Sequence, residues 1–169
     1  TNGNDIVAAV VLPPQQNFKD AAAMEQLAGT LARLLTPVSM EIAGESAQRR
    51  IILRGTGDTI DQVTAQLQAV YGQIEIDLLE PQDDPAEIMA DGGDGVVMGA
   101  ALCAAKPPFL PFKTWREFQD NDPLVALLGA FSNLAPGEMA LSQVVVRGAA
   151  DSHWADGYLE QLVHLKRRG

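Results

Sequence analysis

Two hydrophobic periodicities alternate along the first half of this chain, and their order restricts the fold more than any other feature. Strands show continuous or alternating apolar residues, whereas amphipathic helices repeat them every three or four positions. The strand pattern occurs in four segments, Ile6–Leu12 and residues 38–42, 49–54 and 74–78. A helical pattern follows the first strand and another follows the third. The order is therefore strand, helix, strand, strand, helix, strand.

Each predicted helix has one apolar face and a residue that stops it. In the first, the three- and four-residue steps fall on Met24, Leu27, Ala28, Leu31, Leu34 and Leu35. Pro37 prevents its continuation, because proline has no backbone N–H and its ring clashes with the preceding turn. In the second, the face consists of Ile60, Val63, Leu67, Val70 and Tyr71. Asp58 can cap its start, and Gly72 stands where a left-handed C-cap is expected.

This order predicts an α+β protein whose first part, residues 1–80, is a ferredoxin-like split βαββαβ subdomain. Residues 81–94 are rich in Pro, Asp and Gly and are expected to form a connector. Residues 95–169 are predicted to form a second subdomain of β-α-β-α order, packed on the first. Its elements are a strand at 96–104, a long ordered loop at 106–121, a helix from Pro123, a strand at 139–147 and a last helix capped by Ser152.

Two further helix faces belong to this second part. After Asp122 and Pro123, which form a cap and a first-turn proline, the stripe is Leu124, Leu127, Leu128, Phe131 and Leu134. The last helix is expected to bury Trp154, Tyr158, Leu162 and Leu165.

Charge and composition exclude several classes of function. The net charge is -10 and the isoelectric point is near 4.5, so the surface repels a nucleic-acid backbone and no direct nucleic acid binding is expected. The longest apolar stretch, residues 95–105, is about half of what a membrane-spanning helix needs. The chain opens at Thr1 without a basic and then apolar leader, which favours an excised piece of a larger protein.

The titratable and nucleophilic residues do not form a catalytic or metal-binding pattern. One cysteine allows no intramolecular disulfide, and one cysteine with two histidines gives no Cys/His cluster with zinc spacing. His153 and His164 are eleven residues apart on one predicted helix, roughly 16 Å, and cannot share a metal. Cys103 lies in an apolar predicted strand, where a buried inert thiol is favoured over a nucleophile.

Phosphate-binding and calcium-binding motifs are missing as well. The sequence contains no G-x-x-x-x-G-K-[ST] loop, and the glycines at 92, 93 and 95 precede a predicted strand instead of opening a helix, so they indicate a turn. Asp83, Asp84 and Glu87 lack calcium-loop spacing and are interpreted as a solvated linker. We therefore expect no catalytic, cofactor-binding or metal-binding residue, and no enzymatic activity.

Large aromatic residues and one arginine cluster are the remaining features. Trp115 and Trp154 each follow a loop, where such side chains either seal a core, which is the favoured interpretation, or anchor a partner. With Phe112 they are the candidate interaction anchors. Arg49, Arg50 and Arg54 are expected to lie on a solvated hairpin, with cross-strand partners such as Glu41 and Glu45.

The second half also resembles a known arrangement. The pattern runs FLPFKTWREF at 109–118, DPL at 122–124, LAPGE at 134–138, QVVVR at 143–147 and then Trp154. This order is similar to the region ahead of the motor in HerA/FtsK-type ATPases related to conjugation and type IV secretion. The pattern consists of structural residues, and no catalytic residue is carried over. Because no Walker motif occurs before Gly169, motor activity is not carried over either.

The resemblance implies an accessory domain of a hexamer-forming ATPase that translocates DNA or protein, on the cytoplasmic side of a membrane-associated parent. Its partners would be other subunits or domains of the parent protein, or further copies of the chain in a homo-oligomer. The first hypothesis is thus a non-catalytic interaction domain that contributes to assembly or docking. The alternative is a stand-alone ferredoxin-like domain that binds a small molecule between its halves, and a weaker one is an enzyme of a type that the motifs do not reveal.

Overall fold

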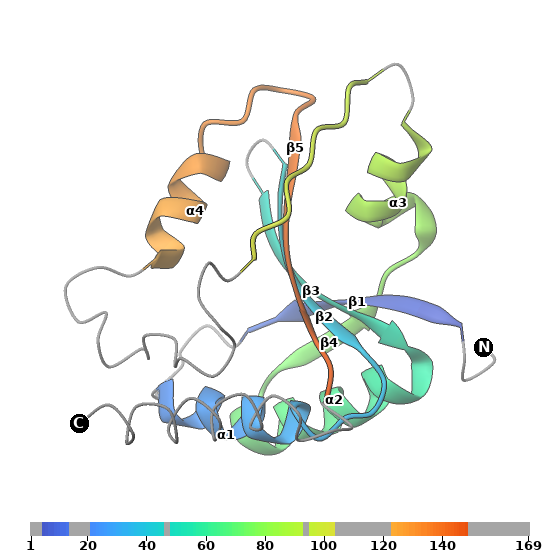
Figure 1. Cartoon of the computed structure of the whole chain (residues 1–169), viewed down its shortest axis with the longest axis vertical. Helices are drawn as coiled ribbons and strands as arrows, with labels where there is room; N and C mark the ends of the chain where they lie inside the picture. Colours follow the sequence, from blue (N-terminus) through green and yellow to red (C-terminus); the bar gives the residue numbers. More distant parts are fainter. Residues whose placement is uncertain (1–4, 14–20, 46–47, 93–94, 104–122, 149–169) are drawn as a thin grey trace, which may run out of the picture.

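A single antiparallel sheet with helices around it forms the body of the molecule (Figure 1). This computed structural model describes residues 5–13, 21–45, 48–92, 95–103 and 123–148. The elements are β1 (Ile6–Leu12), α1 (Ala21–Leu31), β2 (Val38–Glu45), β3 (Gln48–Thr56), α2 (Gly57–Tyr71), β4 (Glu75–Leu78), η1 (Pro81–Asp83), α3 (Pro85–Asp91), α4 (Pro123–Phe131) and β5 (Met139–Val146). The predicted α+β class is confirmed.

The five strands lie in the order β4-β1-β3-β2-β5. Every neighbouring pair is antiparallel, so β1 and β2 run in the same direction with β3 between them. β5 extends this sheet beyond β2, with Val38 opposite Val146 and Glu45 opposite Met139. The two predicted subdomains therefore share one sheet, and the ferredoxin-like assignment of the first stays a prediction.

The main core lies between one face of the sheet and the helices α1 and α2, which run below it in Figure 1. Leu27 and Leu31 of α1 and Leu67 of α2 are buried, as their helical spacing predicts. They meet the strand residues that alternate toward this face, such as Ala9 and Leu53. Each fully buried Leu, Ile or Val contributes about 1.5–3 kcal/mol from the removal of apolar surface from water.

The helix ends differ in part from the prediction. The N-cap of α2 is Thr56, not Asp58, because Thr56 keeps the extended backbone of β3 (φ -67°, ψ 153°) while its hydroxyl accepts a hydrogen bond from the Thr59 N–H at 3.4 Å. Asp58 falls in the first turn, where its charge suits the helix dipole. Gly72 forms the predicted C-cap with φ 68°, and its N–H donates to the Gln68 carbonyl.

The first helix is shorter than predicted. α1 ends at Leu31, and the amides of Arg33 and Leu34 bond back three residues to form a tight last turn. Leu34 still packs against the core, but Leu35 is 80 % exposed. The apolar spacing runs beyond the end of the helix, and Pro37 marks a later limit than the helix reaches.

Residues 81–94, predicted as a connector, contain η1 and α3. Asp84 caps α3 by accepting a hydrogen bond from the Ala86 N–H at 3.0 Å, and Pro85 occupies the first helical position. Proline and aspartate here mark a helix start and not merely a linker. Gly92 follows the helix with φ 71°, in agreement with the predicted turn.

In the second half, α4 and β5 form close to their predicted bounds, but the strand predicted at 96–104 is wrong over the described residues 95–103. That segment has no secondary structure, and Val96 and Met98 are each 90 % exposed. Its β-branched composition suits a strand, but a strand also needs a neighbour to pair with. The loop at 106–121 and the last helix lie outside the described residues.

Phe131, at the end of α4, is buried against the backbone of β2. A Cβ atom placed on Gly44 would lie 2.7 Å from the Phe131 ring, so only glycine permits this approach. The Arg49 guanidinium donates a hydrogen bond to the Phe131 carbonyl. These two contacts join the end of α4 to the β2–β3 hairpin.

Replacing Gly44 by Ala should therefore destabilise the protein by about 1–3 kcal/mol, the usual range for overpacking a filled site. Gly29, in α1, is the matched control, because an added Cβ there meets no atom within 4 Å. Gly29→Ala should leave the stability unchanged or raise it by about 0.5–1 kcal/mol. Urea unfolding of both variants tests this, and equal midpoints would contradict the close approach of Phe131.

Candidate functional site

A charged cluster occupies the face of the sheet opposite to α1 and α2. Leu53 points into the helix-covered core, so its neighbour Arg54 points to the other side. Arg54 stands at the centre of the sheet on β3, where it faces Ala8 on one side and Ser39 on the other. Glu41 lies two residues along β2 from Ser39 and faces Gln143 of β5. Asp84 approaches from the start of α3.

Arg54 binds both carboxylates in a bidentate manner. Its Nε donates to Glu41 Oε1 at 2.9 Å and its Nη2 to Oε2 at 3.1 Å. Toward Asp84, Nη1 and Nη2 each donate to one oxygen at 2.7 Å. Gln143 adds a fourth member, because its Nε2 donates to Glu41 Oε1 at 2.8 Å. The planar guanidinium fork fits two carboxylates at once, which a lysine could not do.

Burial makes this cluster energetically important. The side chain of Glu41 is fully buried, and those of Asp84 and Arg54 are 5 % and 14 % exposed. One cation and two anions leave a formal charge of -1 in the cluster. Removing water from charges is expensive, and hydrogen bonds to both carboxylates offset that cost.

The pKa values follow from the same contacts. Burial alone would raise the pKa of Asp84, but hydrogen bonds from Arg54 and from the Ala86 and Glu87 amides outweigh it and hold the pKa below the ordinary 3.8. The hydrogen bond to Asp84, against the opposing effect of burial and with further help from Glu41, raises the pKa of Arg54. Asp84 and Arg54 are thus both charged across the physiological range.

Around the cluster lies a small second core and one unpaired hydroxyl. Ile52, Ala8 and Ala43 are buried there, with Leu79 and Leu141 packed against them. The hydroxyl of Ser39 is buried without a hydrogen-bond partner. The cluster connects β2, β3, β5 and the start of α3, because the hydrogen bonds of its side chains run between these elements. Such an arrangement stabilises the fold and offers no free nucleophile–base pair.

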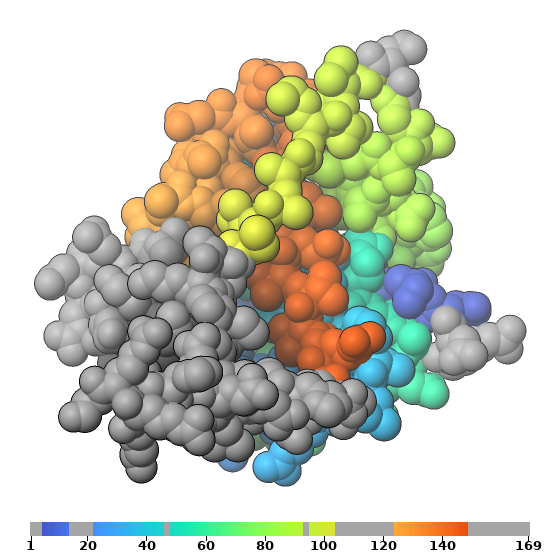
Figure 2. All heavy atoms as spheres, viewed as in Figure 1, coloured from blue at the N-terminus to red at the C-terminus, as the bar shows by residue number. Residues whose placement is uncertain are grey.

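Exposed apolar side chains are spread over the first half of the chain, and a larger group of them lies in the second half. This larger group lies on segment 95–103, on α4 and on β5, whose yellow and orange surfaces adjoin on the face shown in Figure 2. The residues are Val96, Val97, Met98, Leu102, Leu124, Val125, Leu128, Val144 and Val145. Large apolar groups concentrated in this way are typical of an interaction surface.

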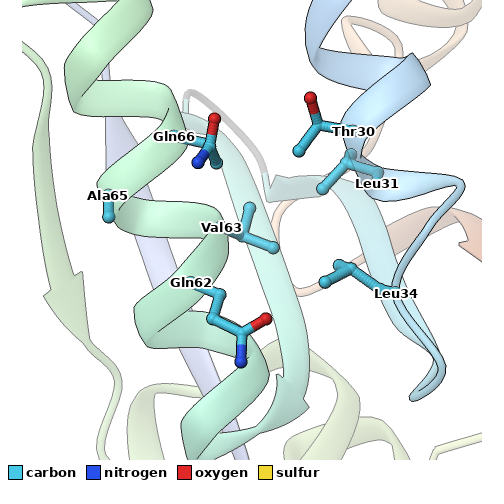
Figure 3. A pocket seen from close by; sticks show the side chains of 7 residues that line it. All are labelled: Thr30, Leu31, Leu34, Gln62, Val63, Ala65 and Gln66. Atoms are coloured by element: carbon cyan, nitrogen blue, oxygen red, sulfur yellow. The ribbon is translucent and has the colours of Figure 1, made fainter.

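A shallow groove between α1 and α2 is a third feature (Figure 3). Leu31 and Leu34 face Val63 across it, and Thr30, Gln62, Ala65 and Gln66 complete its lining. Its volume is about 210 Å³, and it is open to solvent along one side. No charged residue lines it.

The structure locates only some of the residues singled out in the sequence. Trp115, Trp154, Phe112, His153 and His164 lie outside the described residues. Cys103 is exposed, so the interpretation as a buried thiol is wrong, because the strand meant to bury it is not formed.

The arginine cluster and the acidic linker also need correction. Glu41 and Glu45 are partners of Arg54 and Arg50, as predicted, but the Arg54 pair is buried and not solvated. Asp84 is likewise buried, where a solvated linker was expected. The sequence signals for this pairing were weak: an arginine in mid-strand and an Asp-Pro helix start thirty residues later, with nothing to connect them.

Comparisons with protein-family models, with curated proteins and with solved structures found no match to this chain. Within the described ranges, no three His, Cys, Asp or Glu side chains are grouped so that they could hold a metal ion. None of the helices described here is long and apolar enough to cross a membrane.

Arg54→Ala should destabilise the protein by about 3–5 kcal/mol, because it leaves two buried carboxylates without their counter-ion. Arg50→Ala is the control: Arg50 is partly exposed, 3.8 Å from Glu45, and its loss should cost about 1 kcal/mol or less. Urea unfolding at neutral pH compares the two, and similar losses would show that the Arg54 cluster contributes no more than a surface pair.

Acid should weaken the fold through Asp84. Because the folded state holds its pKa below 3.8, the stabilisation is fully present above that value and is lost as the pH falls through the folded pKa. Asp84→Asn cannot titrate, so its free energy of unfolding should fall less than that of the wild type between pH 5 and pH 2. Parallel acid profiles for the two proteins would contradict this assignment.

Proposed function

We propose that this chain is a non-catalytic interaction domain of a DNA- or protein-translocating ATPase of the conjugation and type IV secretion type. It would contribute to assembly or docking on the cytoplasmic side of the membrane. The proposal combines the resemblance of the second half with the surface of the described part. Its partners are the other subunits or domains of the parent protein.

Residues that carry the resemblance have structural roles in this fold. Pro123 starts α4, and Gly137 has the positive φ of 84° that the turn before β5 requires. Glu138 accepts a hydrogen bond from the Ala135 N–H at 2.8 Å and closes that turn. Gln143 joins β5 to the buried Glu41. A pattern of this kind positions a helix and a strand, which supports a role in assembly.

The observation that carries the proposal is the combination of an apolar surface with the outer strand of the sheet. Val144 and Val145 of β5 are 61 % and 59 % exposed, and the apolar side chains of α4 and segment 95–103 belong to the same half of the chain. Exposed apolar area of this extent is normally covered by a partner.

The groove between α1 and α2 is the feature that favours the alternative, a small-molecule-binding domain. Its volume of about 210 Å³ is below the roughly 300–1,000 Å³ of ordinary ligand sites. It also lacks a charged residue that could orient a ligand. The assembly role is therefore the better supported of the two.

The native reading frame tests the proposal directly. We expect it to continue into a G-x-x-x-x-G-K-[ST] motor, and we expect the pure 169-residue chain to show no ATP hydrolysis and no saturable ATP binding by calorimetry. Deleting this region from the parent should lower its hexamer fraction in native mass spectrometry while ATP binding by the motor is retained. A reading frame without a motor, or an active isolated chain, would overturn the proposal.

A further inference from the structure

No strand that the structure describes pairs with the outer edge of β5. β5 is the last strand of the sheet and pairs only with β2, and the backbone bonds of the described chain include none on its other side. Its eight residues, MALSQVVV, contain no charge and no proline. Proteins usually protect an edge with lysine, proline, a bulge or a very short strand, because unpaired N–H and C=O groups attract another strand.

The opposite edge of the same sheet is protected in just this way. β4 has four residues, two of which are the acidic Glu75 and Asp77. It is too short and too charged to accept a second strand readily. The contrast identifies β5 as the edge that is suited to strand addition.

We propose that β5 pairs antiparallel with β5 of a second copy of this chain, joining the two sheets into one across a two-fold axis. This inference deepens the proposed assembly role and rests on it. Symmetric pairing of like edges is the simplest closed arrangement, because each copy offers the same surface and no edge of β5 remains.

The charges beside β5 fix the direction of pairing. Glu138 precedes the strand and Arg147 follows it, both exposed. In an antiparallel pair, the Glu138 end of one copy lies beside the Arg147 end of the other, twice by symmetry. A parallel pair would bring Glu138 to Glu138 and Arg147 to Arg147, which is unfavourable.

The two-fold axis restricts the register. Residues opposite each other in an antiparallel pair point to the same face, so one residue of β5 must lie opposite its own copy. The longest overlap of the eight residues places that residue at Ser142 or Gln143. Val145 then lies opposite Met139 in the first register and Leu141 in the second. Val144 lies opposite Ala140 or Ser142. Both registers cover the exposed valines without burying a charge.

Sedimentation equilibrium of the full chain at 0.15 M salt, where the Debye length is about 8 Å, tests the proposal. The wild type should dimerise. Val144→Lys should weaken the dimer at least about tenfold, because the added charge enters the interface twice. Leu78→Lys is the matched control: it adds the same charge to an exposed residue of β4, the other edge, and should leave the dimer unchanged. If Val144→Lys does not fold, Val145→Lys repeats the test on the opposite face of the sheet. Circular dichroism checks the fold of each variant.

A change of charge tests the antiparallel direction. Arg147→Glu should weaken the dimer, because it places like charges at both ends, and adding Glu138→Gln, which keeps an oxygen for the Ala135 N–H, should restore part of it. A monomeric wild type, a dimer indifferent to lysine in β5, or a double variant as weak as Arg147→Glu alone would overturn the pairing. A monomer whose reading frame continues into a motor would overturn this inference alone and leave the proposed function standing.

Discussion

Arg54 is the residue on which the second face of the sheet depends. One guanidinium binds Glu41 and Asp84 in parallel, and thereby joins strands β2 and β3 to the start of α3. Asp84 also caps α3, so the loss of Arg54 would disturb a helix start together with an ion pair. Each of these charges is buried only because the others are present, since an isolated charge in such a place would cost several kcal/mol. We therefore expect the removal of any one of these charges to disrupt the whole cluster.

Much of this architecture follows from local sequence signals, and the parts that do not are long-range contacts. Helix faces such as Leu27 with Leu31, and the glycine cap at Gly72, depend on neighbours within a few residues, so periodicity predicts them. The Arg54–Asp84 pair joins residues thirty positions apart, and neither residue type normally signals burial. The strand predicted at 96–104 is wrong for the opposite reason. Its local composition suits a strand, but composition does not supply a neighbouring strand to pair with. The pairing of β5 with β2 could not be predicted from local patterns either, since it links residues about a hundred positions apart.

The buried cluster and the open edge are connected through Gln143. This side chain bonds to Glu41 on the face of the sheet, while the backbone of the same strand leaves its outer edge unpaired. Eight residue pairs with β2 and this side-chain bond hold β5 in place. Segment 95–103, in contrast, has a comparable apolar composition but no such attachment. Of β5 and segment 95–103, only β5 is held as a strand that a second strand could join.

An edge strand that is already ordered binds another strand more tightly than a segment that must first become ordered. Fixing the backbone of one residue costs about 1–2 kcal/mol, so a free segment of eight residues would lose most of its hydrogen-bond gain in becoming a strand. β5 has already met that cost through its pairing with β2, and its rigidity comes in part from the hydrogen bond between Gln143 and Glu41, which Arg54 holds in position. The polar cluster thus bears on association without touching a partner. In the proposed dimer, a change at Arg54 would weaken self-association indirectly, through the order of β5, whereas a change at Val144 would act at the interface itself. A double-mutant cycle of the two changes measures this coupling, because residues linked through a shared backbone element give non-additive free energies.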